Sequence, residues 1–218
     1  MFGAALFDLD GTLLDTLEDL ARSTNAALRA LGFPEHPVPA YARFVGDGIK
    51  ELARRALPAG SRDAAVVERC VAAIRAVYGV RWAEHTRPYP GIPELLDALT
   101  ARRLPLAVLS NKPDDLTTLA VSRLLATWRF AAVHGARPHV PLKPHPAGAL
   151  HIARELDLAP ERIVYLGDTR VDMETARAAG MHPVGVLWGF RDAEELRDGG
   201  AAELLAHPGE LLALLEQR

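Results

Sequence analysis

The chain has 218 residues, of which 49% are hydrophobic and 24% are charged, and its formal net charge is −3. This composition predicts a folded globular protein, and the net charge gives no electrostatic reason to expect a nucleic acid or an anionic membrane as a partner. No segment approaches the roughly 18 consecutive apolar residues of a membrane-spanning helix. Because the single Cys70 cannot form an internal disulfide and residues 1–4 lack the basic region of a signal peptide, we expect a cytoplasmic protein.

The first predicted element is a buried strand over residues 4–7, an apolar run that Gly11 brings to an end. Asp8 and Asp10 follow it two positions apart, so they start on the same side of the strand. In an open parallel sheet, ligands bind at this carboxyl edge. Two carboxylates this close repel each other unless a cation neutralises them, and Mg²⁺ suits such oxygen ligands. One aspartate would remain free as a nucleophile, although a solvated Asp-Gly turn explains the same residues.

The next part of the chain, residues 16–87, shows only helical patterns. Apolar side chains at helical spacing predict three helices, over 17–31, about 48–57 and about 62–82. Prolines and glycines mark the breaks between them. The pattern indicates a small helical bundle that is inserted just after the first strand, with residues 88–91 as the return hinge. We therefore expect two domains, one formed by residues 1–15 and 88–218 and the other by residues 16–87.

From residue 91 onward, helical and strand patterns alternate. The expected helices cover residues 92–102, 114–125, 146–156 and 171–179, and the expected strands cover residues 105–109, 130–133, 163–166 and 183–187. Strands separated by helices of this length pair in parallel through right-handed crossovers. The fold class is therefore α/β.

Polar residues also follow the later strands. After the strand at 105–109, the hydroxyl of Ser110 and the N–H groups around Asn111 could hold a phosphoryl oxygen, or they could simply cap a helix. Lys143 is one of three lysines among 25 basic residues, so a compact point charge is indicated at this position. It could stabilise a phosphate or hold Asp8 in place, whereas the alternative is a solvated lysine beside a helix start.

The strand at 163–166 ends at Gly167, and two more acids follow. Asp168 and Asp172 lie about one helical turn apart, so both can face the same corner. A helix cap with an acidic first turn explains either residue alone. It does not explain why four strand ends carry four complementary chemistries.

Taken in order, these motifs resemble those of the haloacid dehalogenase-like superfamily, over nearly the whole chain. The stretches at 7–12, 45–48 and 110–113 most resemble its phosphoglycolate phosphatase-like members. The resemblance implies a Rossmann-like parallel sheet of strand order 3-2-1-4-5 with an inserted α-helical cap. Adjacent first and fourth strands would then bring the four aspartates together.

The resemblance also implies roles for individual residues. Asp8 would attack phosphorus and become an aspartyl phosphate, while Asp10 would protonate the leaving group and then activate water. Mg²⁺ would be held by Asp8, Asp168 and the backbone carbonyl of Asp10, and Asp172 would bind it directly or orient a metal-bound water. The charge of the phosphoryl group would be offset by Ser110, by Asn111 and neighbouring N–H groups, and by Lys143. Thr12 is expected to belong to the phosphate-binding residues by orienting the loop or Asp10, or to serve only the turn.

These residues predict a phosphatase for a small phosphorylated metabolite, with phosphoglycolate as the leading substrate. Asp10 argues against a dehalogenase and a phosphonatase, whereas Gly11-Thr12 separates phosphatases from sugar phosphomutases only weakly. A mutase therefore stays as an alternative, as does a non-catalytic, metal-stabilised regulatory domain. Lys50 and Arg54 of the inserted bundle could pair with a substrate carboxylate, or they could lie on a solvated helix face. We expect a monomer or homodimer.

Overall fold

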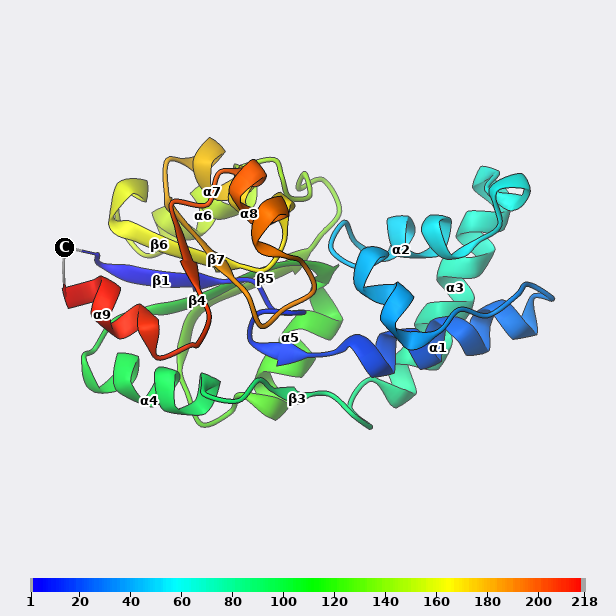
Figure 1. The fold of residues 1–218 in the computed structure, drawn as a ribbon, viewed down its shortest axis with the longest axis horizontal. Helices are drawn as coiled ribbons and strands as arrows, with labels where there is room; N and C mark the ends of the chain where they lie inside the picture. Colours follow the sequence, from blue (N-terminus) through cyan, green and yellow to red (C-terminus); the bar gives the residue numbers. More distant parts are fainter. Residues whose placement is uncertain (1, 217–218) are drawn as a thin grey trace.

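The computed structural model describes residues 2–216, which form an α/β core and a separate group of helices beyond one end of its sheet (Figure 1). The sheet has six strands in the order β5-β4-β1-β6-β7-β8, and all of its neighbouring strands pair in parallel. The strands are β1 (Ala4–Phe7), β4 (Leu106–Pro113), β5 (Phe130–Ala136), β6 (Ile163–Gly167), β7 (His182–Val186) and β8 (Glu203–Leu205). Counted along the chain, β5-β4-β1-β6-β7 corresponds to the order 3-2-1-4-5, and β8 extends the sheet by one strand.

Helices cover both faces of this sheet. They are α4 (Ile92–Ala101), α5 (Asp114–Leu124), α6 (Ala147–Glu155), α7 (Arg170–Ala179), α8 (Ala193–Gly199) and α9 (Glu210–Glu216), with a short 3₁₀ turn at Pro160–Arg162. Along β1, Ala5 and Phe7 join the apolar cluster that includes α4 and α9, whereas Ala4 and Leu6 join the cluster that includes α6 and α7. Because side chains alternate across a strand and both faces are buried, β1 is a continuous apolar run.

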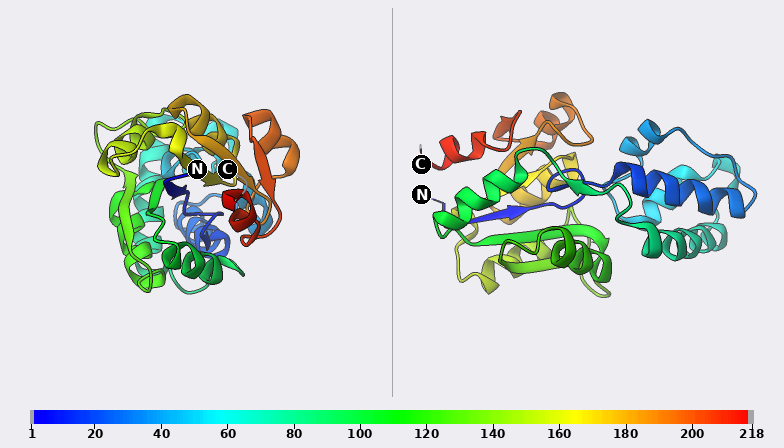
Figure 2. Two further views of the ribbon diagram at one scale, coloured as in Figure 1. Left: turned by 90° about the vertical axis from the view of Figure 1, so that its left-hand side faces the viewer. Right: turned by 90° about the horizontal axis from the view of Figure 1, so that it is seen from below.

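The inserted segment has a hydrophobic cluster of its own. Its helices are α1 (Leu17–Ala30), α2 (Ile49–Ala56) and α3 (Ala64–Arg81), joined by 3₁₀ turns at Val38–Arg43 and Ala59–Ser61. Leu28, Tyr41, Cys70 and Ile74 are buried together in this cluster, which makes Cys70 a small core residue. The right-hand view of Figure 2 shows these helices beyond one end of the sheet and not on one of its faces. We call residues 16–87 the cap.

Two short strands connect the cap to the core. β2 (Leu14–Asp15) and β3 (Arg87–Pro88) pair in an antiparallel ribbon at the point where the chain leaves the core and returns to it. Beside them, the buried carboxylate of Asp19 accepts hydrogen bonds from the backbone N–H of His85 at 2.9 Å and from the N–H and hydroxyl of Thr86, both at 2.8 Å. Burial alone would raise the pKa of Asp19, but these hydrogen bonds outweigh it and lower the pKa. The carboxylate thereby ties α1 to the returning segment.

The structure differs from the expected elements mainly at two places. β4 continues past residue 109 to Pro113, so Ser110 and Asn111 belong to the strand and do not cap a helix. The short elements β8, α8 and α9 were not expected, because segments of three to seven residues carry too little periodicity to be read from the sequence. Within residues 2–216, no helix is both long enough and apolar enough to cross a membrane.

Candidate active site

Three adjacent strands bring the predicted motifs to one edge of the sheet. β1 lies between β4 and β6, so Asp8 lies between Ser110 on β4 and Asp168, which follows β6. The N–H of Asp8 donates to the carbonyl of Leu166 at 2.9 Å, which carries the parallel pairing of β1 and β6 just beyond the end of β1. The acids therefore stand on backbone that the sheet holds rigidly.

Asp8, Asp168 and Asp172 form a buried cluster in which one carboxylate oxygen of each lies within 4.8 Å of the others. Burial, and repulsion from Asp172, raise the pKa of Asp8 to about 7, although Lys143 opposes the shift. Burial and the neighbouring carboxylates raise the pKa of Asp168 as well. Both shifts follow first from burial and then from repulsion among the acids.

Lys143 lies in the segment between β5 and α6 and is the ammonium in contact with this cluster among the described residues. Its Nζ lies 2.8 Å from Asp8 Oδ1 and 2.6 Å from Asp172 Oδ1. Burial alone would lower the pKa of Lys143, but the attraction of Asp172 and Asp8 outweighs it and raises the pKa. Three carboxylates then face one ammonium, which leaves an excess of two negative charges when all are ionised. A divalent cation that prefers oxygen ligands fits this deficit.

Asp172 is already held by the protein through both of its oxygens. Oδ1 accepts from Lys143 at 2.6 Å and from the Tyr165 hydroxyl at 3.3 Å. Oδ2 accepts from the hydroxyl of Thr169 at 2.6 Å and from its backbone N–H at 3.1 Å. This capping box at the start of α7 fixes the carboxylate, so Asp172 is better placed to position Lys143 than to offer free lone pairs to a metal.

Thr12 has a different contact from the expected one. Its buried hydroxyl donates to Asp168 Oδ1 at 3.1 Å, while the N–H of Phe190 donates to Asp168 Oδ2 at 2.9 Å. Gly11 has a φ of 95°, and a Cβ at this position would overlap the Asp168 carboxylate. Thr12 therefore orients Asp168 and not Asp10, because its hydroxyl is turned inward toward that carboxylate.

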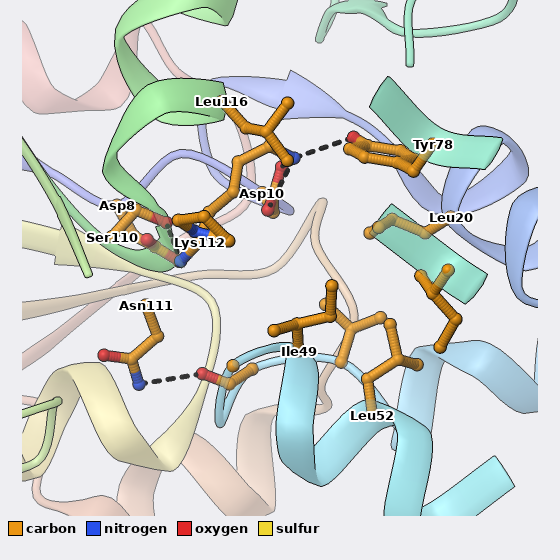
Figure 3. A pocket seen from close by; sticks show the side chains of 15 residues that line it. Asp8, Asp10, Leu20, Ile49, Leu52, Tyr78, Ser110, Asn111, Lys112 and Leu116 are labelled. Carbon is orange, nitrogen blue, oxygen red and sulfur yellow. Dashed lines mark hydrogen bonds and ion pairs between the residues drawn. The ribbon is translucent and has the colours of Figure 1, made fainter. Parts of the chain in front are cut away.

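Ser110 and Asn111 reach the same edge through β4. The hydroxyl of Ser110 accepts from the N–H of Lys112 at 3.3 Å and lines a pocket beside Asp8. The Asn111 amide is bonded on both sides to the Lys143 backbone, accepting from its N–H at 2.9 Å and donating to its carbonyl at 3.1 Å. It also donates to the carbonyl of Gly46 at 3.2 Å (Figure 3). Asn111 thus holds Lys143 in place and contacts a cap loop.

The role of Lys112, the neighbour of Asn111, was not predicted from the sequence. Its Nζ lies 2.9 and 3.1 Å from the two oxygens of Asp10 and donates to the hydroxyl of Tyr78 at 2.7 Å (Figure 3). The side chain is only 4% exposed. Burial alone would lower the pKa of Lys112, but Asp10 and Tyr78 outweigh it and raise the pKa. The scarcity of lysine was the available signal for Lys112, whereas Tyr78 of the cap carried none.

The pocket above the acids lies between core and cap. Its cavity volume is about 50 Å³. The residues that line it from the core are Asp8, Asp10, Ser110, Asn111, Lys112, Pro113 and Leu116, and those from the cap are Leu20, Val45, Gly46, Gly48, Ile49, Leu52, Ile74 and Tyr78. Figure 3 shows the apolar side chains of the cap facing the polar groups of the core. The cap thus closes an apolar roof over the reactive edge.

Lys50 and Arg54 do not line this pocket. Lys50 is 67% exposed and pairs with Glu68 at 2.7 Å, and Arg54 pairs with Glu51 at 2.7 Å on the outer surface of the cap. Ile49 and Leu52 occupy the inward face of α2 instead, so the helical phase directs both cations outward. The structure therefore supports the solvated-face alternative for Lys50 and Arg54 and places neither of them beside the pocket.

A core arginine also holds the cap in this position. The guanidinium of Arg191 donates to the carbonyl of Val45 at 2.9 Å and to that of Ala42, and its Nε pairs with Glu195 at 3.0 Å. Together with Asn111 and Lys112, it links the core to two parts of the cap, the loop at residues 42–46 and helix α3. The contacts place the cap in a closed position over the acids.

Comparisons with known proteins agree with this geometry. The family model described as haloacid dehalogenase-like hydrolase matches residues 5–186. A phosphoglycolate phosphatase from Chromobacterium violaceum is 34% identical over 88% of each chain, and one from Aquifex aeolicus is 31% identical over 97% of this chain and 95% of its own. A solved haloacid dehalogenase-like family hydrolase from Streptococcus pneumoniae superposes with a TM-score of 0.87 at 25% identity, covering 98% of both chains.

Proposed function

The chain belongs to the haloacid dehalogenase-like hydrolase family, and from this premise we propose that it is a Mg²⁺-dependent phosphatase of a small phosphomonoester, with phosphoglycolate as the leading substrate. The observation that carries the proposal is the buried cluster of Asp8, Asp168 and Asp172 around Lys143, with Asp10 and a small closed pocket beside it. Two relatives named phosphoglycolate phosphatase support the choice of substrate.

In the proposed reaction, Asp8 is the nucleophile. Its carboxylate attacks phosphorus, a new O–P bond forms to Asp8, and the bond from phosphorus to the alcohol oxygen breaks. Asp10, on the same loop and in the same pocket, donates the proton that the leaving alkoxide needs. In the second half, Asp10 accepts a proton from water as the water oxygen attacks the aspartyl phosphate, which regenerates Asp8 and releases inorganic phosphate.

The charge of the phosphoryl group is offset by groups that are already in place. Lys143 contacts Asp8 directly, and the Asn111 amide fixes its backbone, so the ammonium needs no rearrangement during the reaction. Ser110 offers a hydroxyl to the phosphoryl oxygens from the same strand end. Asp8, Asp168 and the backbone carbonyl of Asp10 would hold Mg²⁺, which when bound neutralises the acids and polarises the phosphoryl group.

The cap excludes water and limits the size of the leaving group. Its apolar side chains form the roof of the pocket, and a cavity of about 50 Å³ admits a leaving group of only a few heavy atoms. The substrate is thus a small phosphorylated metabolite, bound with the phosphoryl group at Asp8 and the remainder under the cap. We continue to predict that the protein is a monomer or a homodimer and that it acts in the cytoplasm.

Phosphate release from 2-phosphoglycolate tests the proposal. The wild type with Mg²⁺ should release phosphate, and Asp8→Asn under the same conditions should not. Conversion of a hexose 1-phosphate into its 6-phosphate faster than phosphate release would favour the sugar phosphomutase alternative. Binding of Mg²⁺ without turnover of any phosphomonoester would favour a regulatory domain and would contradict the proposed activity.

A further inference from the structure

The pocket must also contain residues that recognise the leaving group of the substrate, which is the part beyond the phosphoryl group. Lys50 and Arg54, the expected partners of an acidic group, lie outside it. Among the described residues that line the pocket, Lys112 is the one with a cationic side chain, and Tyr78 is the one aromatic residue. The two are in direct contact, so they form a single polar spot where the core meets the otherwise apolar roof.

This polar spot offers the cavity a positive charge and a free hydrogen-bond donor. The three N–H donors of Lys112 Nζ face the two oxygens of Asp10 and the hydroxyl of Tyr78, so Lys112 would contribute its charge and not a free N–H. Because Tyr78 Oη accepts the bond from Lys112, its own O–H proton is free to be donated. Both side chains line the cavity, so the O–H donor of Tyr78 and the adjacent charge of Lys112 are available to the same ligand.

The charge and the shape of the pocket indicate which ligand this is. A carboxylate accepts a hydrogen bond from a hydroxyl and is attracted to an adjacent ammonium, and both interactions strengthen when apolar walls exclude solvent. Leu20, Ile74 and Leu116 line the same pocket and leave little other hydrogen-bonding capacity under the cap. The cavity of about 50 Å³ places the acidic group within a few bonds of the phosphoryl oxygen.

We propose that Lys112 of the core and Tyr78 of the cap together bind the carboxylate of a short acidic leaving group and thereby determine the substrate specificity of the enzyme. The inference rests on the proposed phosphatase function and specifies its substrate class, a phosphomonoester of a short hydroxy acid. Since Tyr78 comes from α3 and Lys112 from β4, the acidic substrate also joins the cap to the core when it binds.

The test compares two substrates that differ in one group. We would measure kcat and KM for 2-phosphoglycolate and for 2-hydroxyethyl phosphate, which is of similar size but has no carboxylate. In Tyr78→Phe, kcat/KM for 2-phosphoglycolate should fall roughly 10- to 100-fold further than that for 2-hydroxyethyl phosphate, the scale of one hydrogen bond to a charged group. The additional loss should lie in KM, because the contact holds the leaving group and does not act on phosphorus.

Lys112→Met provides a second variant and Lys50→Met its control. Lys112→Met should reduce the preference for 2-phosphoglycolate at least as strongly, even though it also removes the partner of Asp10 and slows both substrates. Lys50→Met removes an exposed lysine outside the pocket, so the ratio of the two kcat/KM values should stay at that of the wild type. Melting temperatures would identify a variant that fails to fold, and the conclusion would then come from the other pocket variant.

The outcomes separate this inference from the proposed function. Equal losses on both substrates in Tyr78→Phe and Lys112→Met, or a change of the ratio in Lys50→Met, would overturn the carboxylate site while leaving the phosphatase intact. The same holds if the wild type shows no preference for 2-phosphoglycolate. If the wild type with Mg²⁺ hydrolyses neither ester nor any other phosphomonoester, the proposed function fails, and this inference fails with it.

Discussion

Replacing Lys143 by methionine tests what its ammonium contributes to the stability of the protein and to the turnover of substrate. Methionine keeps an unbranched side chain of similar length and removes only the ammonium. In the wild type, this group lies 2.8 Å from Asp8 and 2.6 Å from Asp172, with its side chain 3% exposed. The variant therefore leaves two buried carboxylates without their cation.

The magnitude follows from that burial. Removing one partner of a buried ion pair destabilises a protein by about 3–5 kcal/mol, because the remaining charge is left uncompensated. For a chain of this size, 1 kcal/mol corresponds to roughly 2–4 °C in Tm, so metal-free Lys143→Met should melt about 6–20 °C below the wild type. Turnover of 2-phosphoglycolate should fall roughly 10²–10³-fold, the scale of one lost transition-state stabilising group. Lys143→Arg should not restore it fully, because a planar fork does not replace a point charge.

Calorimetry with and without Mg²⁺ is the assay. Because the variant has one more uncompensated negative charge in the cluster, Mg²⁺ should raise its Tm by more than it raises the Tm of the wild type. Lys50→Met, which removes an exposed lysine, should melt close to the wild type in both conditions. A Lys143→Met protein with wild-type Tm and wild-type turnover would refute the argument, since it would show that the ammonium neither neutralises the cluster nor acts on the phosphoryl group.

Three further predictions address other parts of the molecule. Asp8→Asn should reduce activity to background, whereas Asp10→Asn should reduce it roughly 10²–10⁴-fold in steady-state assays, and near-native kcat in Asp8→Asn would exclude the covalent mechanism. Dialysis against a chelator should abolish turnover and Mg²⁺ should restore it, so undiminished turnover in metal-free buffer would contradict the metal role. Because the folded pKa of Asp19 lies below its unfolded value of 3.8, its hydrogen bonds stabilise the protein above that pH and are lost as the pH falls through the folded pKa. Asp19→Asn should therefore lower Tm at pH 7, with a deficit that shrinks below about pH 4, and a deficit independent of pH would contradict the role of its charge.

The parts of the site that could be predicted from the sequence are those that the sheet itself places. Asp8, Ser110 and Asp168 each follow an apolar run, and parallel strands necessarily present their carboxyl ends at one edge. To place a site at this edge, only the order of strands and helices must be known, and the spacing of apolar residues in the sequence predicts that order. The contacts of the neighbouring residues Thr12 and Asn111 were harder to predict, because the direction of a side chain depends on local packing. Thr12 thus bonds Asp168, and the Asn111 amide bonds the Lys143 backbone.

The orientation of the cap helices relative to the core could not be predicted from the sequence. The helices themselves could be predicted from spacing, but the face that each one turns toward the core is set by how the bundle docks. On α2, the inward positions are Ile49 and Leu52, so the cations beside them point outward, opposite to what their proximity to a glycine-bearing loop had suggested. No pattern in α3 distinguishes Tyr78 from the other apolar positions of that helix.

Because Tyr78 contacts Lys112, the closed cap completes the proposed carboxylate-binding site as well as excluding water from Asp8. Lys112 bonds the carboxylate of Asp10 and the hydroxyl of Tyr78 at the same time, so its position depends on both the core and the cap. If the cap moved away, Lys112 would lose its hydrogen bond to Tyr78 and keep its ion pair with Asp10. Lys112 would then remain on the core while Tyr78 moved with the cap. A substrate acid that needs both groups therefore binds only to the closed form, in which water is excluded from Asp8. On this argument, the group that identifies the substrate is also the group that closes the active site around it.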